Sequence, residues 1–74
     1  MGTRLTAQAA VIDALNAAGR ELSGAEIQCS AKLGVGVLYP ALMELELAGM
    51  ATSRWQEGPA PRRRLYRLTA TPAP

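Results

Sequence analysis

The chain has 74 residues, the length of one small domain, and its 49% hydrophobic and 19% charged residues are typical of a folded globular protein. It has no histidine and one cysteine, which excludes histidine-based catalysis, histidine ligation of a metal and an internal disulfide. The longest nearly unbroken apolar run, Leu33 to Met43, is about half of the roughly 20 residues that a membrane-spanning helix needs. We therefore expect a cytoplasmic, non-membrane protein without metal or cofactor.

The net charge of +2 is unevenly distributed along the chain. Residues 1–53 carry three basic and five acidic side chains, whereas residues 54–74 carry five basic side chains and one acidic one. All five of the basic residues in the second segment are arginines, namely Arg54, Arg62, Arg63, Arg64 and Arg67. Clustered arginines indicate a surface for phosphates or acidic partners. The alternative is a solvated sheet edge, where charge prevents sheet-to-sheet association.

The first predicted helix begins near Leu5. Its apolar residues recur at helical spacing and comprise Leu5, Ala9, Ile12 and Leu15, with Val11, Ala14 and Ala18 widening the stripe. Thr3 or Thr6 can cap the start of this helix. Gly19 lies where a left-handed C-terminal cap belongs.

The second predicted helix begins near Ser23 and ends at Gly34. Ser23 and Glu26 have the spacing of a capping box, in which each side chain accepts a hydrogen bond from a backbone N–H of the first turn. Apolar residues at helical spacing, Ile27, Ala31 and Leu33, are expected to point inward.

The third predicted helix covers residues 36–48 and ends at Gly49. Leu38, Leu42 and Leu45 share one face of it. With Gly36 as the N-cap, Pro40 would fall in the first turn, where its missing N–H removes no intrahelical bond.

After Gly49 the pattern changes to that of strands. Met50 to Gln56 and Arg63 to Leu68 are predicted to form a two-stranded hairpin with a proline-rich tip. We expect Trp55 and Tyr66 to pair across the two strands and seal the core. Residues 1–70 are then one domain, and residues 71–74 a flexible C-terminal tail.

This order of elements predicts an α+β fold, a three-helix winged helix-turn-helix with a two-stranded β-hairpin wing. In that fold the second helix crosses the DNA backbone, helix 36–48 faces the major groove and the wing reaches the flanking phosphates.

The third helix also carries a recognisable sequence. The segment Gly36-Val37-Leu38-Tyr39-Pro40-Ala41-Leu42, followed by Leu45-Glu46 and Gly49-Met50, resembles the G-x-L-Y-P-x-L…L-E…G-L signature of PadR-like transcriptional regulators. Residues 63–69 look like the R-x-x-Y-x-L-T wing strand of that family, and residues 24–27 are similar to part of its second helix. The resemblance covers roughly residues 5–70 and implies a bacterial or phage DNA-binding repressor. It also implies a homodimer on a pseudo-palindromic operator, often responding to aromatic small molecules.

The chain departs from that family in two respects. Family members continue into C-terminal helices that build most of the dimer interface and much of the effector pocket, whereas this sequence stops at Pro74. The expectation is either a minimal, effector-free version or a dimer formed through the first helix or the wing. The third helix also has no lysine or arginine and instead carries Met43 and Glu44, which weakens direct reading of bases.

The predicted DNA-binding residues are Val37, Tyr39, Pro40, Met43, Arg54, Arg62, Arg63 and Arg64. Side chains at the wing tip and at the start of a recognition helix commonly bind phosphates. Tyr39 can either donate to a phosphate or close the core as a half-buried aromatic. Arg63 and Arg64 alternate on a strand and are not expected to point the same way. Arg54 is expected to extend the arginine patch from the facing strand.

The alternative to DNA binding is a protein-interaction or self-association module. The face opposite the leucines of the third helix consists of Pro40, Met43 and Leu47, and an exposed apolar stripe marks a protein contact more often than a DNA contact. Apolar side chains can also touch thymine methyls. No catalytic constellation is present: Cys29 has no histidine partner and the carboxylates are scattered. The sequence therefore predicts no enzyme.

Overall fold

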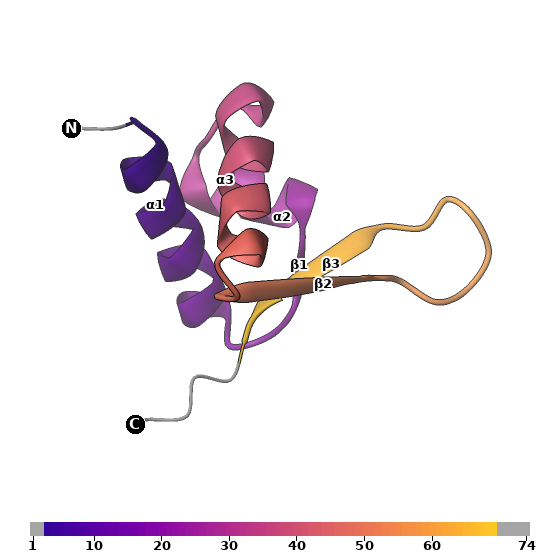
Figure 1. Ribbon diagram of the computed structural model, residues 1–74. Coiled ribbons are helices and arrows are strands. Elements are labelled where there is room, and N and C mark those ends of the chain that lie inside the picture. The colour runs from indigo at the N-terminus through magenta and orange to yellow at the C-terminus, as the bar shows by residue number, and fades with distance from the viewer. Residues whose placement is uncertain (1–2, 70–74) are drawn as a thin grey trace.

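The computed structural model describes residues 3–69, with side chains from Thr6 onward. Three helices, α1 (Thr3–Ala18), α2 (Gly24–Ala31) and α3 (Val35–Leu47), form a body from which a hairpin projects (Figure 1). The sheet has three antiparallel strands in the order β1-β3-β2, with β1 at Leu22–Ser23, β2 at Ala51–Trp55 and β3 at Arg64–Leu68. The predicted winged-helix fold is confirmed, and β1 is an additional short strand that the sequence did not indicate.

Helix α1 ends as predicted but buries a different stripe. Gly19 adopts a φ of 64°, and its N–H donates to the Leu15 carbonyl at 3.1 Å. The buried side chains are Ala7, Val11, Ala14 and Leu15, whereas Ala9 and Ala18 are exposed and Ile12 is only partly buried. The prediction was therefore right for Val11, Ala14 and Leu15 and wrong for Ala9 and Ala18, because alanine is apolar enough to fit either face. Since the helix already begins at Thr3, Thr6 lies inside it, while the side chains of Thr3 and Leu5 lie outside the described residues.

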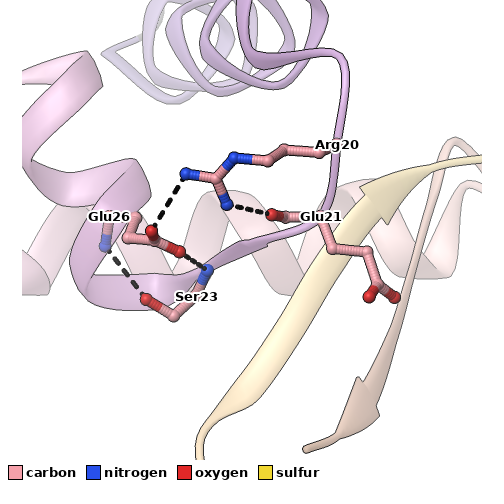
Figure 2. Close-up of polar contacts among 4 residues, drawn as sticks. All are labelled: Arg20, Glu21, Ser23 and Glu26. Carbon is pink, nitrogen blue, oxygen red and sulfur yellow. Dashed lines mark hydrogen bonds and ion pairs between the residues drawn. The ribbon is translucent and has the colours of Figure 1, made fainter.

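The start of α2 is the predicted capping box. The Glu26 N–H donates to Ser23 Oγ at 3.2 Å, and the Ser23 N–H donates to Glu26 Oε1 at 2.8 Å (Figure 2). The helix ends at Ala31, three residues before the predicted end, because Lys32 takes the left-handed conformation with a φ of 57°. The N–H of Leu33 still bonds the Gln28 carbonyl, and Leu33 packs partly against the core.

Helix α3 begins earlier than predicted. Its N-cap is Gly34, so Pro40 lies in the second turn and not in the first. Pro40 therefore cannot donate to the carbonyl of Gly36, four residues earlier, which is exposed to water. The C-terminal end is as predicted: Gly49 has a φ of 77°, and the Met50 N–H donates to the Leu45 carbonyl at 2.9 Å.

The core lies between the three helices and one face of the sheet. Its fully buried large side chains are Val11, Ile27, Leu38, Leu42 and Leu45. Leu22 of β1, Ala51 of β2 and Tyr66 of β3 close it from the sheet side. The body is thereby complete without any residue of the wing loop between β2 and β3.

The wing corrects one prediction. Tyr66 is buried, with 5% of its surface exposed, but it lies opposite Ser53 and not opposite Trp55. Trp55 is 58% exposed and pairs in register with Arg64. The prediction that Trp55 seals the core was wrong, because Trp55 is the last residue of β2, next to the wing loop, where its register partner is Arg64 and not a core residue. Residues 71–74, predicted as a flexible tail, lie outside the described residues.

Candidate DNA-binding surface

The N-terminal half of α3 and the start of α2 are brought together at Tyr39. Gly24, the first residue of α2, permits the approach, because a Cβ at position 24 would collide with the Tyr39 phenol oxygen. Tyr39 nevertheless remains 46% exposed. Tyr39 therefore packs the hydroxyl end of its ring against Gly24 of α2, while part of the residue stays exposed.

Tyr39 faces the wing across a hollow. The residues that line it are Ser23, Gly24, Ala25, Tyr39, Arg63, Arg64 and Tyr66. The hollow thus joins the recognition-helix position of the helix-turn-helix to the arginine segment of the wing. Both Arg63 and Arg64 line it, against the expectation that they diverge, because β3 begins at Arg64 and Arg63 lies outside the strand.

Arg64 is held in place by its neighbours. Its Nε donates to Ser53 Oγ at 3.0 Å, and its guanidinium carbon lies 5.2 Å from the centre of the Trp55 ring, within cation–π range. Ser53 Oγ in turn donates to Glu46 Oε2 of α3 at 2.7 Å. These contacts connect the strands of the wing to α3. Arg64 therefore helps to hold the wing in position and also contributes positive charge to the surface.

Tyr66 lies next to the same network. Burial raises the pKa of its phenol above 10.0, and the nearby Glu46 carboxylate raises it further. The phenol is therefore protonated at neutral pH and adds no charge to the hollow.

Arg62 and Arg63 differ from Arg64. Both are exposed at the end of the wing loop, and within the part of the chain that the structure describes neither forms an ion pair. The loop projects beyond the helices (Figure 1). These guanidinium groups are therefore free to meet an anionic partner.

Arg54 does not extend the arginine patch as predicted. Its Nε and Nη2 donate to the two carboxylate oxygens of Glu21 at 2.8 and 2.6 Å. This bidentate hydrogen bond holds the pKa of Glu21 below its ordinary value of 4.5. Arg54 also lies on the face of β2 opposite to Trp55, because neighbouring strand residues point to opposite sides. The sequence spacing could not reveal that Glu21, 33 positions earlier, neutralises Arg54.

A second ion pair secures the capping box. Arg20 Nη2 lies 3.2 Å from Glu26 Oε2, and Arg20 Nη1 donates to the Glu21 carbonyl at 2.9 Å (Figure 2). The pKa of Glu26 lies below its ordinary value, first because the Ser23 N–H bonds its carboxylate and then because Arg20 does. Arg20 and Arg54 thus each form an ion pair with a carboxylate, Arg20 with Glu26 and Arg54 with Glu21.

The predicted residues of α3 are mostly exposed. Pro40 and Met43 face away from the core, with 62% of Met43 exposed. Val37, in contrast, is partly buried and packs against the core, so only part of its side chain is accessible. Leu47 is also exposed, as the predicted apolar stripe requires.

Other chemistries find no support in the described geometry. Within residues 3–69, no three cysteine, aspartate or glutamate side chains are grouped as metal ligands. None of the helices in that range combines the length and apolar character needed to cross a bilayer.

A helix-turn-helix of α2 and α3 with a β2–β3 wing defines a winged-helix protein. The chain belongs to the transcriptional regulator PadR-like family, whose family model matches residues 14–71. The family comprises transcriptional regulators and not enzymes, which confirms the expectation from the sequence.

Solved structures support the same fold. A PadR family transcription regulator from hypervirulent Clostridium difficile R20291 is 22% identical, with a TM-score of 0.76 over 86% of this chain and 72% of that one. The protein smu.1704 from Streptococcus mutans UA159 is 29% identical, with a TM-score of 0.72 over 86% of this chain and 65% of that one. This chain therefore spans about two thirds to three quarters of their lengths. A search of curated proteins found no match.

Proposed function

We propose that the chain binds double-stranded DNA sequence-specifically and represses transcription, with α3 at the major groove and the wing loop on flanking phosphates. The observation that carries this proposal is the placement of Arg63, which lines the hollow that leads to Tyr39 on α3. Like the adjacent Arg62, it is exposed and forms no ion pair among residues 3–69. In duplex DNA, phosphates flank the major groove, which is wide enough for a helix. Unpaired arginines near an exposed helix can therefore bind phosphates while the helix contacts base edges. Family membership supports the same partner.

The site residues of this proposal have separate roles. Arg62 and Arg63 bind phosphates directly, and Tyr39 donates its hydroxyl to a phosphate at the edge of the groove. Pro40 and Met43 face the base pairs. Arg64 orients the wing through Ser53 and Trp55 while adding positive potential.

Assembly and location belong to the same proposal. The protein acts in the bacterial or phage-infected cytoplasm as a homodimer on a pseudo-palindromic operator, with half-sites about 34–36 Å apart. It needs no metal or cofactor. Sedimentation of the protein alone and on an operator duplex tests the stoichiometry: two copies per duplex supports the dimer, and one copy contradicts it.

The test of DNA binding is a fluorescence-anisotropy titration of a mixed-sequence duplex at several salt concentrations. Replacing Arg63 with glutamine should lower the slope of log affinity against log salt by about 0.9, and replacing Arg62 as well should lower it by about 1.8. Arg67→Gln is the matched control, because Arg67 is an exposed arginine of β3 on the face opposite to Arg64. Equal losses for Arg63→Gln and Arg67→Gln would show that net charge, and not the wing, binds DNA.

A second candidate function uses the apolar face of α3 for self-association or for another protein. The observation in its favour is that Leu47 is 81% exposed on the same face as Pro40 and Met43. In that case Met43→Glu would dissociate the assembly in sedimentation experiments and leave weak DNA binding intact. Under the DNA proposal the same change weakens duplex binding, because a carboxylate enters the groove.

A further inference from the structure

The outward side of α3 has an unusual composition for a surface that faces base pairs. We define the outer face of α3 as Gly36, Pro40, Met43 and Leu47, which lie on the side of the helix opposite the buried Leu38, Leu42 and Leu45. None of the four has a side chain that donates or accepts a conventional hydrogen bond. Tyr39, the residue before Pro40, lines the hollow that leads to the wing.

The carboxylates of α3 are held by neighbouring elements. Glu44 Oε1 accepts a hydrogen bond from Gln8 Nε2 of α1 at 2.7 Å. Glu46 Oε2 accepts one from Ser53 Oγ of β2 at 2.7 Å. Both acidic groups therefore lie at the flanks of the helix, toward α1 and the sheet, and leave the outer face apolar and uncharged.

Charge identifies what covers this face. The wing loop carries Arg62 and Arg63, which are exposed and form no ion pair within residues 3–69, and Arg63 lines a hollow together with Tyr39, the residue before Pro40. An apolar helix face next to a residue that shares a hollow with an arginine is complementary to a polyanion that also presents apolar groups. The major groove of DNA has this combination, because the C5-methyl group of thymine projects into it between the phosphate strands.

We propose that the outer face of α3 selects DNA sites by apolar contact with thymine methyl groups and not by hydrogen bonds to base edges. This inference rests on the proposed DNA-binding function and names the chemical group that α3 reads. Pro40 and Met43 lie in the middle of the helix and make these contacts. Guanine and cytosine present only hydrogen-bond acceptors and donors in the major groove. They therefore offer no methyl group for the outer face of α3 to contact.

Gly36 fits the same role. A Cβ at position 36 would meet no protein atom within 4 Å, and the residue has no left-handed φ, so the fold itself does not require a glycine there. Alanine would be the better helix former at this site. A glycine on the outer face instead lets the helix backbone come close to the floor of the groove.

The experiment starts with a duplex enriched by the wild-type protein from a randomised library. Each thymine of that duplex is then replaced by deoxyuridine, which removes the methyl group and keeps every hydrogen-bonding group. We expect about three- to fourfold weaker binding for each contacted methyl, the value of one methyl group removed from water. The Met43→Ala variant should lose sensitivity to at least one of these replacements, whereas Arg63→Gln should keep the full sensitivity.

A gain of function complements this loss. Replacing cytosine by 5-methylcytosine adds a methyl at the equivalent position of the groove, and it should improve binding to a duplex in which a contacted thymine was changed to cytosine. Gly36→Ala should bind the enriched duplex at least threefold more weakly while unfolding at higher urea concentration than the wild type, which separates close approach from folding.

The outcomes distinguish this inference from the function on which it rests. If deoxyuridine changes nothing at any position while Arg63→Gln still lowers the salt slope, the methyl inference is wrong and DNA binding stands. If no duplex is enriched and the wild type shows no salt-dependent binding, both fail. If Met43→Ala instead separates a complex of two chains without altering the response to deoxyuridine, the outer face binds a second copy and the inference is overturned.

Discussion

In the helical body, Leu38, Leu42 and Leu45 of α3 lose all or nearly all contact with solvent, and polar contacts such as the Ser23–Glu26 capping box hold the helix ends. In the wing, Trp55, Arg62 and Arg63 are exposed. Burial therefore separates the residues that hold the fold from those available to a partner. Substitutions of buried residues in the body should act on stability, and those in the wing loop or on the exposed side of α3 on affinity.

The largest effect should come from the body. Replacing Leu42 with alanine removes a side chain with only 1% of its surface exposed and should lower the free energy of unfolding by about 2–5 kcal/mol. Urea denaturation followed by circular dichroism measures this loss. The control is Leu47→Ala in the same helix, which should change stability by less than about 0.5 kcal/mol because Leu47 is exposed. Similar losses for both variants would contradict the assigned faces of α3.

The helix cap should give the next effect. Ser23→Ala leaves the Glu26 N–H without its acceptor and should cost about 1 kcal/mol of unfolding free energy. Ser30→Ala, an exposed serine of the same helix, is the matched control and should stay within about 0.5 kcal/mol. A wild-type urea midpoint for Ser23→Ala would show that the capping box does not stabilise α2.

A smaller effect should separate two neighbouring arginines. Arg64→Gln removes the hydrogen bond to Ser53 and the contact with Trp55, and should cost about 0.5–1 kcal/mol. It should also shift the fluorescence emission of Trp55, the single tryptophan. Arg63→Gln should leave both quantities unchanged and lower only the affinity for DNA. If the two variants behave alike in stability, the division between a structural and a binding arginine is wrong.

The smallest effect concerns pH. The pKa values of Glu21 and Glu26 are lower in the folded protein than their ordinary value of 4.5. Their ionised forms therefore stabilise the fold fully above about pH 4.5, and this contribution is lost as the pH falls through the lower folded pKa. Stability should decline below about pH 4.5, and the decline should be shallower in Glu26→Gln. Thermal unfolding between about pH 3 and pH 7 tests this, and an identical profile in the variant would contradict it.

Local patterns in the sequence predicted most of the helical body. The Ser23–Glu26 spacing predicted the start of α2, Gly19 and Gly49 predicted two helix ends, and three leucines predicted the buried face of α3. Each of these signals involves residues within one or two helical turns. The order of the elements then predicted the winged-helix fold.

The errors in the sheet and the wing involve partners that are distant in the chain. Strand β1 exists because Leu22 and Ser23 pair with β3, more than 40 residues later, and two residues alone carry no strand pattern. Arg54 forms an ion pair with Glu21, which precedes β1 and is distant in the sequence. Trp55 is exposed, whereas Tyr66 on the neighbouring strand is buried in the core. The sequence correctly predicted that arginines cluster in the wing. Only the folded structure shows that Arg54 is paired with a carboxylate, whereas Arg62 and Arg63 form no ion pair within residues 3–69.

The central claim is that α3 and the wing loop form one surface for duplex DNA. Titration of the isotope-labelled 7.8 kDa protein with a duplex, followed by amide chemical shifts, tests it most directly. We expect the largest shifts in two segments, residues 35–43 and residues 56–64, and little change in the C-terminal half of α1. Shifts confined to α1 and α2, with the wing loop unchanged at saturating duplex, would contradict it.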